Sequence, residues 1–186
     1  MPRLPEFDET HFDARQRTIY NEILTSRGHL GGPFKIWLYS PELADRTQRL
    51  GEFLRYHTSL DPRLSELAIL VVGRHYNCQV EWTLHERFAR EAKLDSAIID
   101  ALRQRAIPDK LQADEAAVYS YASEILTGAV VSEETFATAQ NILGDKALVE
   151  LTSLVGHYVH VSMTLNAFQV PLPLDVPPTL PDAPVY

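Results

Sequence analysis

The sequence predicts an all-α protein, a compact single-domain helical bundle, on three observations. Signals for the start of a helix recur along the chain, and the apolar residues between them follow helical spacing. The sequence carries no β-hairpin signal and no clear internal repeat. Its 186 residues, 45% of them hydrophobic, suit one domain with a sizeable core. We expect one helical domain over residues 1–169 and an extended proline-rich tail over residues 170–186.

The first half of the chain carries two strong helix starts. An N-terminal helix is expected near Asp13–Ser26, ahead of a loop at Gly28–Pro33. Ser40-Pro41-Glu42 then supplies a capping hydroxyl, a proline at the first helical position and an acid in the first turn. This pattern predicts a helix to about His57, and Asp61-Pro62 repeats the same device.

The helix after Asp61-Pro62 has an ambiguous middle. Residues 67–72, Leu-Ala-Ile-Leu-Val-Val, are apolar on all sides and are compatible with a buried strand. We interpret them as helix, because a capped start precedes them and no second strand is available for pairing. A stop at Gly144 is also expected. The later helices are predicted at Asn77–Ala92, Asp95–Gln104, Gln112–Leu126, Ser132–Leu143 and Asp145 to about Ala167.

The tail has a composition of its own. Six of the twelve prolines follow Gln169, which excludes helix and favours extended chain with polyproline character. The tail also contains Leu172, Leu174, Val176 and Leu180, apolar residues that free tails usually lack. Two interpretations stay open: a disordered end, or an arm lying across its own domain or a neighbouring subunit.

Charge and cysteine content exclude several classes of protein. The chain has 17 basic and 25 acidic residues, a formal charge of −8, which argues against a nucleic-acid partner. No apolar run is long enough to span a membrane, and the first ten residues lack a signal pattern. The lone Cys78 has no internal disulfide partner, so we expect a cytoplasmic protein.

The predicted helix over residues 77–92 carries unusual polar residues on an apolar face. A buried acid needs a partner, so Glu81 on this stripe requires an explanation. The opposite face is expected to be solvated and holds Gln79, Thr83, Glu86, Arg87, Arg90 and Lys93. The apolar face holds Cys78, Glu81, Trp82, His85, Phe88, Ala89 and Ala92.

Glu66 on the preceding helix is the predicted partner. If the two helices form an antiparallel pair with a turn near Tyr76-Asn77, Glu66 lies about ten residues before the turn and His85 about eight after it. At 1.5 Å per residue, these positions are roughly 15 and 13 Å from the turn, so the side chains approach laterally. A Glu66 carboxylate oxygen should then be within hydrogen-bond reach of His85.

Three kinds of chemistry fit the four residues Glu66, Cys78, Glu81 and His85. Two carboxylates and an imidazole can transfer protons. A thiol at a helix N-terminus can act as a nucleophile, although an ionised Glu81 would disfavour its thiolate form. A structural Glu–His pair with Cys78 as an apolar filler is the third. Metal-like spacing at Glu81/His85 and at His157/His160 is weak, so we expect no metal and no cofactor.

The residues around this cluster resemble a known family. Residues 63–70, Arg-Leu-Ser-Glu-Leu-Ala-Ile-Leu, followed by residues 77–85, Asn-Cys-Gln-Val-Glu-Trp-Thr-Leu-His, are similar to the carboxymuconolactone decarboxylase family within the alkylhydroperoxidase D-like superfamily. The resemblance implies a helical fold of that type and assembly into homo-oligomers, as trimers or hexamers. In the peroxidase branch the pattern is a Glu, then Cys-x-x-Cys, then a His.

This chain departs from the peroxidase pattern. Glu66, Cys78 and His85 match, but Glu81 replaces the second cysteine and Val80 replaces the intervening histidine of that pattern. The peroxidase cycle uses the second cysteine to form a disulfide. Without it, a sulfenic acid at Cys78 would need an outside thiol.

Three functions are therefore predicted. In the first, a decarboxylase-like enzyme acts on a small carboxylated or lactone substrate: Glu66 and Glu81 shuttle protons, His85 stabilises or protonates an enolate, and Trp82 lines an apolar wall. In the second, Cys78 is the nucleophile of a one-cysteine hydroperoxide reductase with His85 and Glu66 as its proton relay. The third is a non-catalytic oligomeric binding protein.

Overall fold

The fold is all-α, as the sequence predicts. The structure, a computed structural model, describes residues 2–5, 8–28 and 30–186, and those residues contain helices and no strand. The short elements η1 and α2 were not predicted from the sequence, because they are too brief to show a helical period. The helices are η1 (Glu9–His11), α1 (Ala14–Arg27), α2 (Phe34–Trp37), α3 (Pro41–Tyr56), α4 (Pro62–His75), α5 (Gln79–Glu91), α6 (Ser96–Arg103), α7 (Ala113–Gly128) and α8 (Glu133–Phe168).

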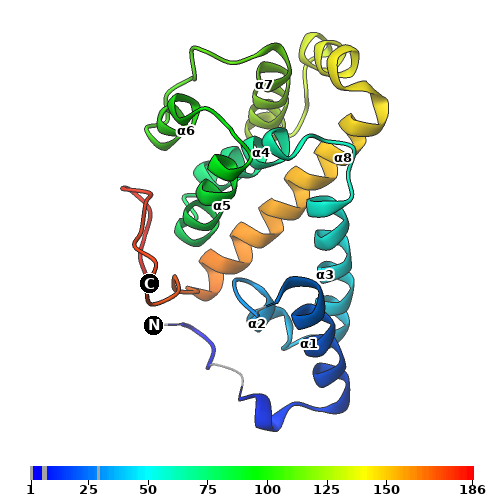
Figure 1. The fold of residues 1–186 in the computed structure, drawn as a ribbon, viewed down its shortest axis with the longest axis vertical. Coiled ribbons are helices and arrows are strands. Elements are labelled where there is room, and N and C mark those ends of the chain that lie inside the picture. The colour runs from blue at the N-terminus through cyan, green and yellow to red at the C-terminus, as the bar shows by residue number, and fades with distance from the viewer. Residues whose placement is uncertain (1, 6–7, 29) are drawn as a thin grey trace.

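Helix α4 lies at the centre of the bundle. It packs against α5, α7 and α8, and α5 runs beside it as the other half of a hairpin (Figure 1). Residues 67–72 are helical and are all at most 6% exposed. A single chain therefore covers every side of this apolar helix, and no second copy is needed to hide it.

Most of the helix starts and stops predicted from the sequence are confirmed by the structure. Asp61 and Asp95 cap α4 and α6 by accepting hydrogen bonds from the backbone N–H groups of Arg63 and Ala97. The Ser40 hydroxyl makes no capping hydrogen bond, so Pro41 alone marks the start of α3. Gly144 adopts a φ of 80° and a ψ of 163°, and this non-helical residue divides α8 in two, as predicted.

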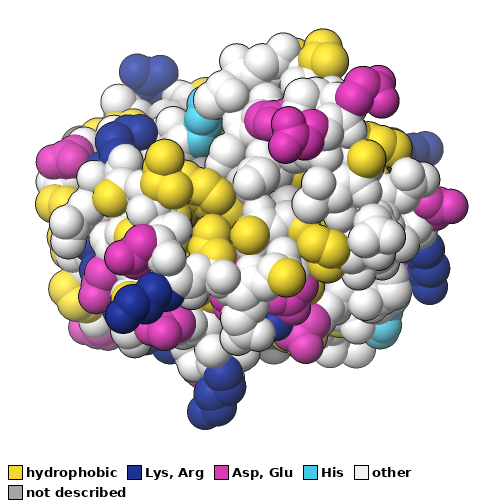
Figure 2. Space-filling view, turned by 90° about the horizontal axis from the view of Figure 1, so that it is seen from above, with side chains coloured by type: hydrophobic (Ala, Val, Ile, Leu, Met, Phe, Trp, Pro, Cys, Tyr) yellow, Lys and Arg dark blue, Asp and Glu magenta, His cyan; other side chains and the backbone are white. Residues whose placement is uncertain are grey.

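The end of the bundle near α7 and the first part of α8 has an apolar surface. Seen from above, hydrophobic side chains gather in the middle of this face, with acidic and basic side chains around them (Figure 2). Phe136 and Ile142, in the first part of α8, are about two-fifths exposed. Within the described residues, no helix combines the length and the apolarity that a membrane span requires.

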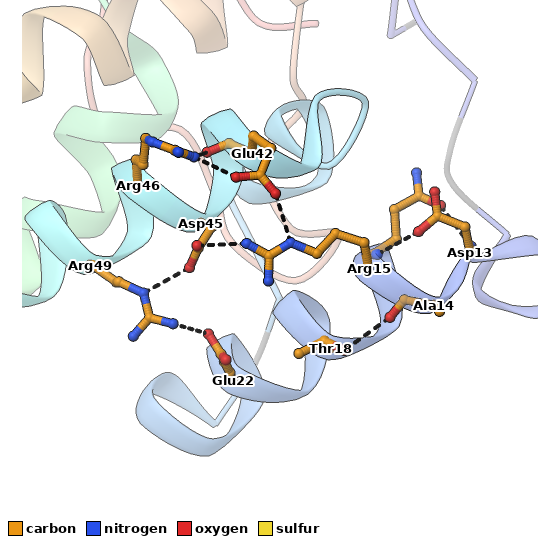
Figure 3. A network of polar contacts seen from close by, with 10 residues as sticks. Asp13, Ala14, Arg15, Thr18, Glu22, Glu42, Asp45, Arg46 and Arg49 are labelled. Atoms are coloured by element: carbon orange, nitrogen blue, oxygen red, sulfur yellow. Dashed lines mark hydrogen bonds and ion pairs between the residues drawn. The ribbon is translucent and has the colours of Figure 1, made fainter.

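A network of ion pairs holds α1 against α3 (Figure 3). Arg15 of α1 contacts Glu42 and Asp45 of α3, each at 2.8 Å, and Arg49 of α3 reaches back to Glu22 of α1 at 2.8 Å. These pairs are mostly exposed, so solvent screening leaves each of them only a small contribution to stability. They orient the N-terminal helices rather than provide the core.

The proline-rich tail lies across its own chain. It runs along α5, with Leu180 only 2% exposed (Figure 1). The backbone N–H of Thr179 donates to the Thr83 hydroxyl, and Arg103 donates to the Thr179 carbonyl at 3.2 Å. Of the two interpretations of the tail, the arm is therefore correct, and the surface that it covers belongs to the same chain.

Candidate functional site

The site is built at the hairpin between α4 and α5. Asn77 turns the chain with a φ of 49°, and the Cys78 N–H donates to the Gly73 carbonyl at 2.9 Å. Gly73 packs directly against the first turns of α5, where a Cβ would lie 3.4 Å from the backbone nitrogen of Trp82. The turn at Tyr76-Asn77 predicted from the sequence is confirmed, and with it the lateral register of the two helices.

Three side chains form a buried row across this hairpin. Nδ1 of His85 lies 2.6 Å from Oε2 of Glu66, which confirms the predicted contact. On the other side of the ring, Nε2 lies 3.0 Å from Oε1 of Glu81. That second contact is an ion pair without hydrogen-bond geometry, so Glu81 Oε1 is buried and has no hydrogen-bond donor. All three residues are at most 7% exposed.

The two carboxylates keep the imidazole charged. Burial alone would lower the pKa of His85, but the negative charges of Glu66 and Glu81 outweigh it and raise the pKa to about 9. At neutral pH, His85 is therefore an imidazolium ion with a carboxylate at each nitrogen. This arrangement holds a titratable proton between two acceptors in a buried site.

Cys78 lies beside this row but is a weak acid. It is the N-cap of α5 and is fully buried. Burial and the Glu81 carboxylate raise the thiol pKa to about 12, although the Ser162 hydroxyl and the backbone N–H groups of Val80 and Glu81 act in the opposite direction. The predicted activation of the thiol by the helix N-terminus is therefore overcome by its surroundings.

Aromatic rings close the site. The rings of Tyr158 and Phe88 make edge-to-face contacts with His85, with ring centroids at 5.1 and 5.6 Å. Phe88 is only partly buried, and the Arg55 guanidinium lies over it at 4.2 Å. Arg63, in contrast, is bound to Asp114 and Glu115 of α7. The Arg87 guanidinium also lies over the Phe88 ring, at 4.7 Å, so two cations are placed near His85 with Phe88 between them and it.

Trp82 and Glu86 occupy a second buried cluster on α5. The Trp82 indole N–H donates to Glu86 Oε2 at 3.2 Å, and the Arg103 guanidinium lies 5.8 Å from the indole ring. Trp82 thus contacts this cluster, and its predicted role as a substrate wall stays a prediction.

The solvated face predicted for α5 is partly wrong. Gln79, Thr83 and Glu86 are all at most 8% exposed, because the tail and Arg103 of α6 cover them. The sequence does contain one indication of this burial: the tail carries apolar residues, and these are expected to pack against another surface. Nothing local to α5 identifies that surface.

The two histidines of α8 lie on a different element. His160 stacks on Trp37 of α2 at 5.1 Å, and His157 lies 6.3 Å from the same ring. In the part of the chain that the structure describes, no group of three or more His, Cys, Asp or Glu side chains has the arrangement of a metal site.

The fold is that of the alkylhydroperoxidase D-like proteins. A protein of unknown function from Agrobacterium tumefaciens, proposed to be an antioxidant defence protein, AhpD, is 18% identical, with a TM-score of 0.67 over 78% of this chain and 100% of that one. An uncharacterised peroxidase-related protein from Silicibacter sp. TM1040 is 14% identical, with a TM-score of 0.76 over 94% and 93%. The debrominase Bmp8 is 12% identical, with a TM-score of 0.72 over 91% of each chain.

Residues 41–124 match the sequence profile of the carboxymuconolactone decarboxylase family. This segment begins at the start of α3 and ends in α7, so it contains the whole α4–α5 hairpin and its four candidate residues. No curated protein matches the sequence. At the identities given above, the solved structures establish the fold and leave the reaction to be argued from the site.

Proposed function

We propose that this protein is a decarboxylase-like acid–base enzyme acting on a small carboxylated or lactone substrate. The observation that carries the proposal is the buried row Glu66–His85–Glu81, in which a charged imidazole stands between two carboxylates. The Glu81 oxygen that faces Nε2 at 3.0 Å is paired with the ring by charge, without a well-formed hydrogen bond. A carboxylate in this position can exchange a proton with the imidazole and pass it to a substrate.

The proposed reaction uses the row as a proton relay. The bond between the substrate's carboxylate carbon and its neighbour breaks, CO2 leaves, and the electron pair enters an adjacent carbonyl as an enolate. The His85 imidazolium stabilises the enolate oxygen, and a proton from the His85–Glu81 pair is delivered to carbon. Glu66 holds the ring in place through Nδ1, and a proton from solvent replaces the one that passes to carbon, which restores the charge of His85 after CO2 has left.

Substrate would reach His85 past Phe88. Phe88 is partly buried and touches the His85 ring, and Arg55 lies over its face. Movement of this one side chain would open a path to the imidazole beside a guanidinium. That guanidinium supplies the cation that an anionic substrate requires in a chain with a formal charge of −8.

A one-cysteine hydroperoxide reductase is the second candidate. The position of Cys78 at the N-cap of α5 favours it. The thiol pKa of about 12 counts against it, because the attacking species is the thiolate. The third candidate, a non-catalytic binding protein, predicts no turnover with either substrate class.

We also propose that the protein is a cytoplasmic homo-oligomer, a trimer or hexamer, without a nucleic-acid or membrane partner. The apolar α4 and the tail do not require a second copy, since one chain buries both. Support comes instead from Leu50, Phe53 and Val149, which are 48, 43 and 67% exposed and line a hollow of about 480 Å³ between α3 and α8. A monomeric mass by light scattering at micromolar concentration would contradict this assembly.

Replacing Cys78 by Ser tests the choice between the two reactions. The variant and the wild type are assayed for CO2 release from carboxymuconolactone and for thiol-dependent reduction of cumene hydroperoxide. A decarboxylase retains most of its activity, because serine fills the same space and the relay is intact. Activity on the hydroperoxide that is abolished by Cys78→Ser would establish the reductase instead.

A further inference from the structure

Two arginines converge outside the candidate site, where the tail crosses the α4–α5 turn. Arg74, the next-to-last residue of α4, is 5% exposed, and its Nη1 donates to Oδ1 of Asn77. Nη2 of Arg105, from the segment after α6, donates to the same oxygen at 2.8 Å. Asn77 and Arg105 both adopt left-handed backbone, with φ of 49° and 58°, and these turns direct them toward Arg74.

The anion that faces these arginines comes from the tail. Oδ2 of Asp182 lies 3.2 Å from Nη2 of Arg74, and Asn77 Nδ2 donates to the Asp182 carbonyl at 3.4 Å. The Asp182 side chain is 70% exposed, while that of Arg74 is 6% exposed. One solvated carboxylate therefore faces Arg74, and Arg105 is joined to Arg74 through the shared Asn77 oxygen, so the three charged side chains keep a net positive charge.

Asp182 uses only half of the binding edge of Arg74. The Nε and Nη2 groups form the fork that binds both oxygens of a carboxylate or two of a phosphate. Nη2 contacts Asp182, but Nε is buried and has no hydrogen-bond partner. An unsatisfied buried donor is unfavourable, so an anion that bridged both groups would satisfy a group that Asp182 leaves without a partner.

We propose that Arg74, Arg105 and Asn77 form a binding site for a small oxyanion, a carboxylate or phosphate group, which Asp182 fills in its absence. Binding of the anion and docking of this part of the tail are then mutually exclusive. The neighbouring tail residues would be released together, because Thr179 contacts Thr83 and Leu180 pairs with the Gln79 amide in the orientation that satisfies both groups.

Release of the tail would also affect the candidate site. Gln79 and Val80 lie between Cys78 and Glu81 along α5, and tail residues cover them together with the end of α8. The anion would therefore uncover the first turn of α5. The proposed site itself lies outside the Glu66–His85–Glu81 row and does not depend on the reaction that the row performs.

Phosphate binding to three full-length variants tests the proposal. Inorganic phosphate is titrated into each protein by calorimetry, with chloride at equal ionic strength as the control. Succinate is titrated in the same way as a carboxylate ligand. Asp182→Asn should bind about two- to fivefold more tightly than wild type, since the competing charge is removed. Arg105→Gln should bind phosphate at least about tenfold more weakly than wild type. Because Arg105 is exposed, its replacement should leave the fold intact. Asp175→Asn, an exposed tail control, should match wild type.

Hydrogen exchange supplies the second readout. Phosphate should accelerate exchange of the Thr179 and Ala183 amides, which donate to Thr83 and to the Leu180 carbonyl. Binding of phosphate or succinate that releases the tail supports the site. The anion that binds more tightly shows whether the site prefers a phosphate or a carboxylate group. Equal affinities in wild type, Asp182→Asn and Arg105→Gln, an absence of binding in all of them, or binding without faster exchange would overturn the proposal.

Discussion

Glu81 and Glu86 are two buried carboxylates on the same helix, and their partners differ. Glu86 contacts Arg90 at 2.8 Å and Arg103 at 2.6 Å. Burial raises its pKa, but the hydrogen bonds from these arginines outweigh that effect and lower it. Glu81 faces His85, a group that titrates, and keeps one oxygen without a donor.

The comparison separates a structural carboxylate from a chemical one. Arginine keeps its proton throughout the range in which proteins are stable, so Glu86 is a fixed charge that ties α5 to α6 and to the tail. Histidine gains or loses its proton near neutrality, so the Glu81–His85 pair stores a proton that can be moved. Burial alone does not distinguish the two sites, because both acids are at most 8% exposed. The identity of the partner does.

The largest expected effect is a difference in reaction rate between variants of Glu81 and Glu86. Glu81→Gln should lower the rate of carboxymuconolactone decarboxylation by about 10²–10⁴-fold, because the amide cannot exchange the proton. Glu86→Gln is the matched control and should stay within a few-fold of wild type. Single-turnover rates measure both. Equal losses in the two variants would mean that the distinction between them is wrong.

The next effect is a pH dependence of stability. The folded-state pKa of His85, about 9, lies above its ordinary value of 6.5, so the folded state binds the proton more tightly than the unfolded state. The stabilisation is complete below pH 6.5 and is lost as the pH rises through 9, by an amount on the order of 3 kcal/mol. Urea unfolding at several pH values measures it. The decline between these pH values should be much smaller in His85→Gln, and an unchanged decline would assign it to other groups.

A smaller effect is expected from removing the structural acid. Glu86→Ala leaves the buried part of Arg103 and the Trp82 N–H without their acceptor, which should lower the free energy of unfolding by about 1–3 kcal/mol. Glu91→Ala is a suitable control, since its ion pair with Arg87 is exposed. The tail should also loosen in Glu86→Ala, because Arg103 holds the Thr179 carbonyl. A variant as stable as the control would show that the cluster is dispensable.

Sequence reasoning succeeded where neighbouring residues determine the geometry. The α4–α5 hairpin follows from the Asp61-Pro62 start and from the turn at Asn77, and the lateral approach of Glu66 to His85 follows from equal distances to that turn. The break at Gly144 is likewise a local property of one residue. The fold class follows from the same signals.

Sequence reasoning failed where residues far apart in the chain meet. The burial of Gln79, Thr83 and Glu86 depends on a tail that lies about a hundred positions away, so helical periodicity alone assigned them to solvent. The pKa of Cys78 was also beyond prediction, because it depends on depth of burial in addition to the helix N-terminus and Glu81.

The charge of His85 is the central claim, and nitrogen NMR of its imidazole ring tests it most directly. With ¹⁵N-labelled histidine, both ring nitrogens should carry protons at pH 7 and remain protonated until about pH 9. Glu81→Gln should lower that midpoint, whereas Glu86→Gln should leave it in place, because Glu86 faces arginines. A ring with one unprotonated nitrogen at pH 7 in the wild type would contradict the account, since the row would then hold no mobile proton.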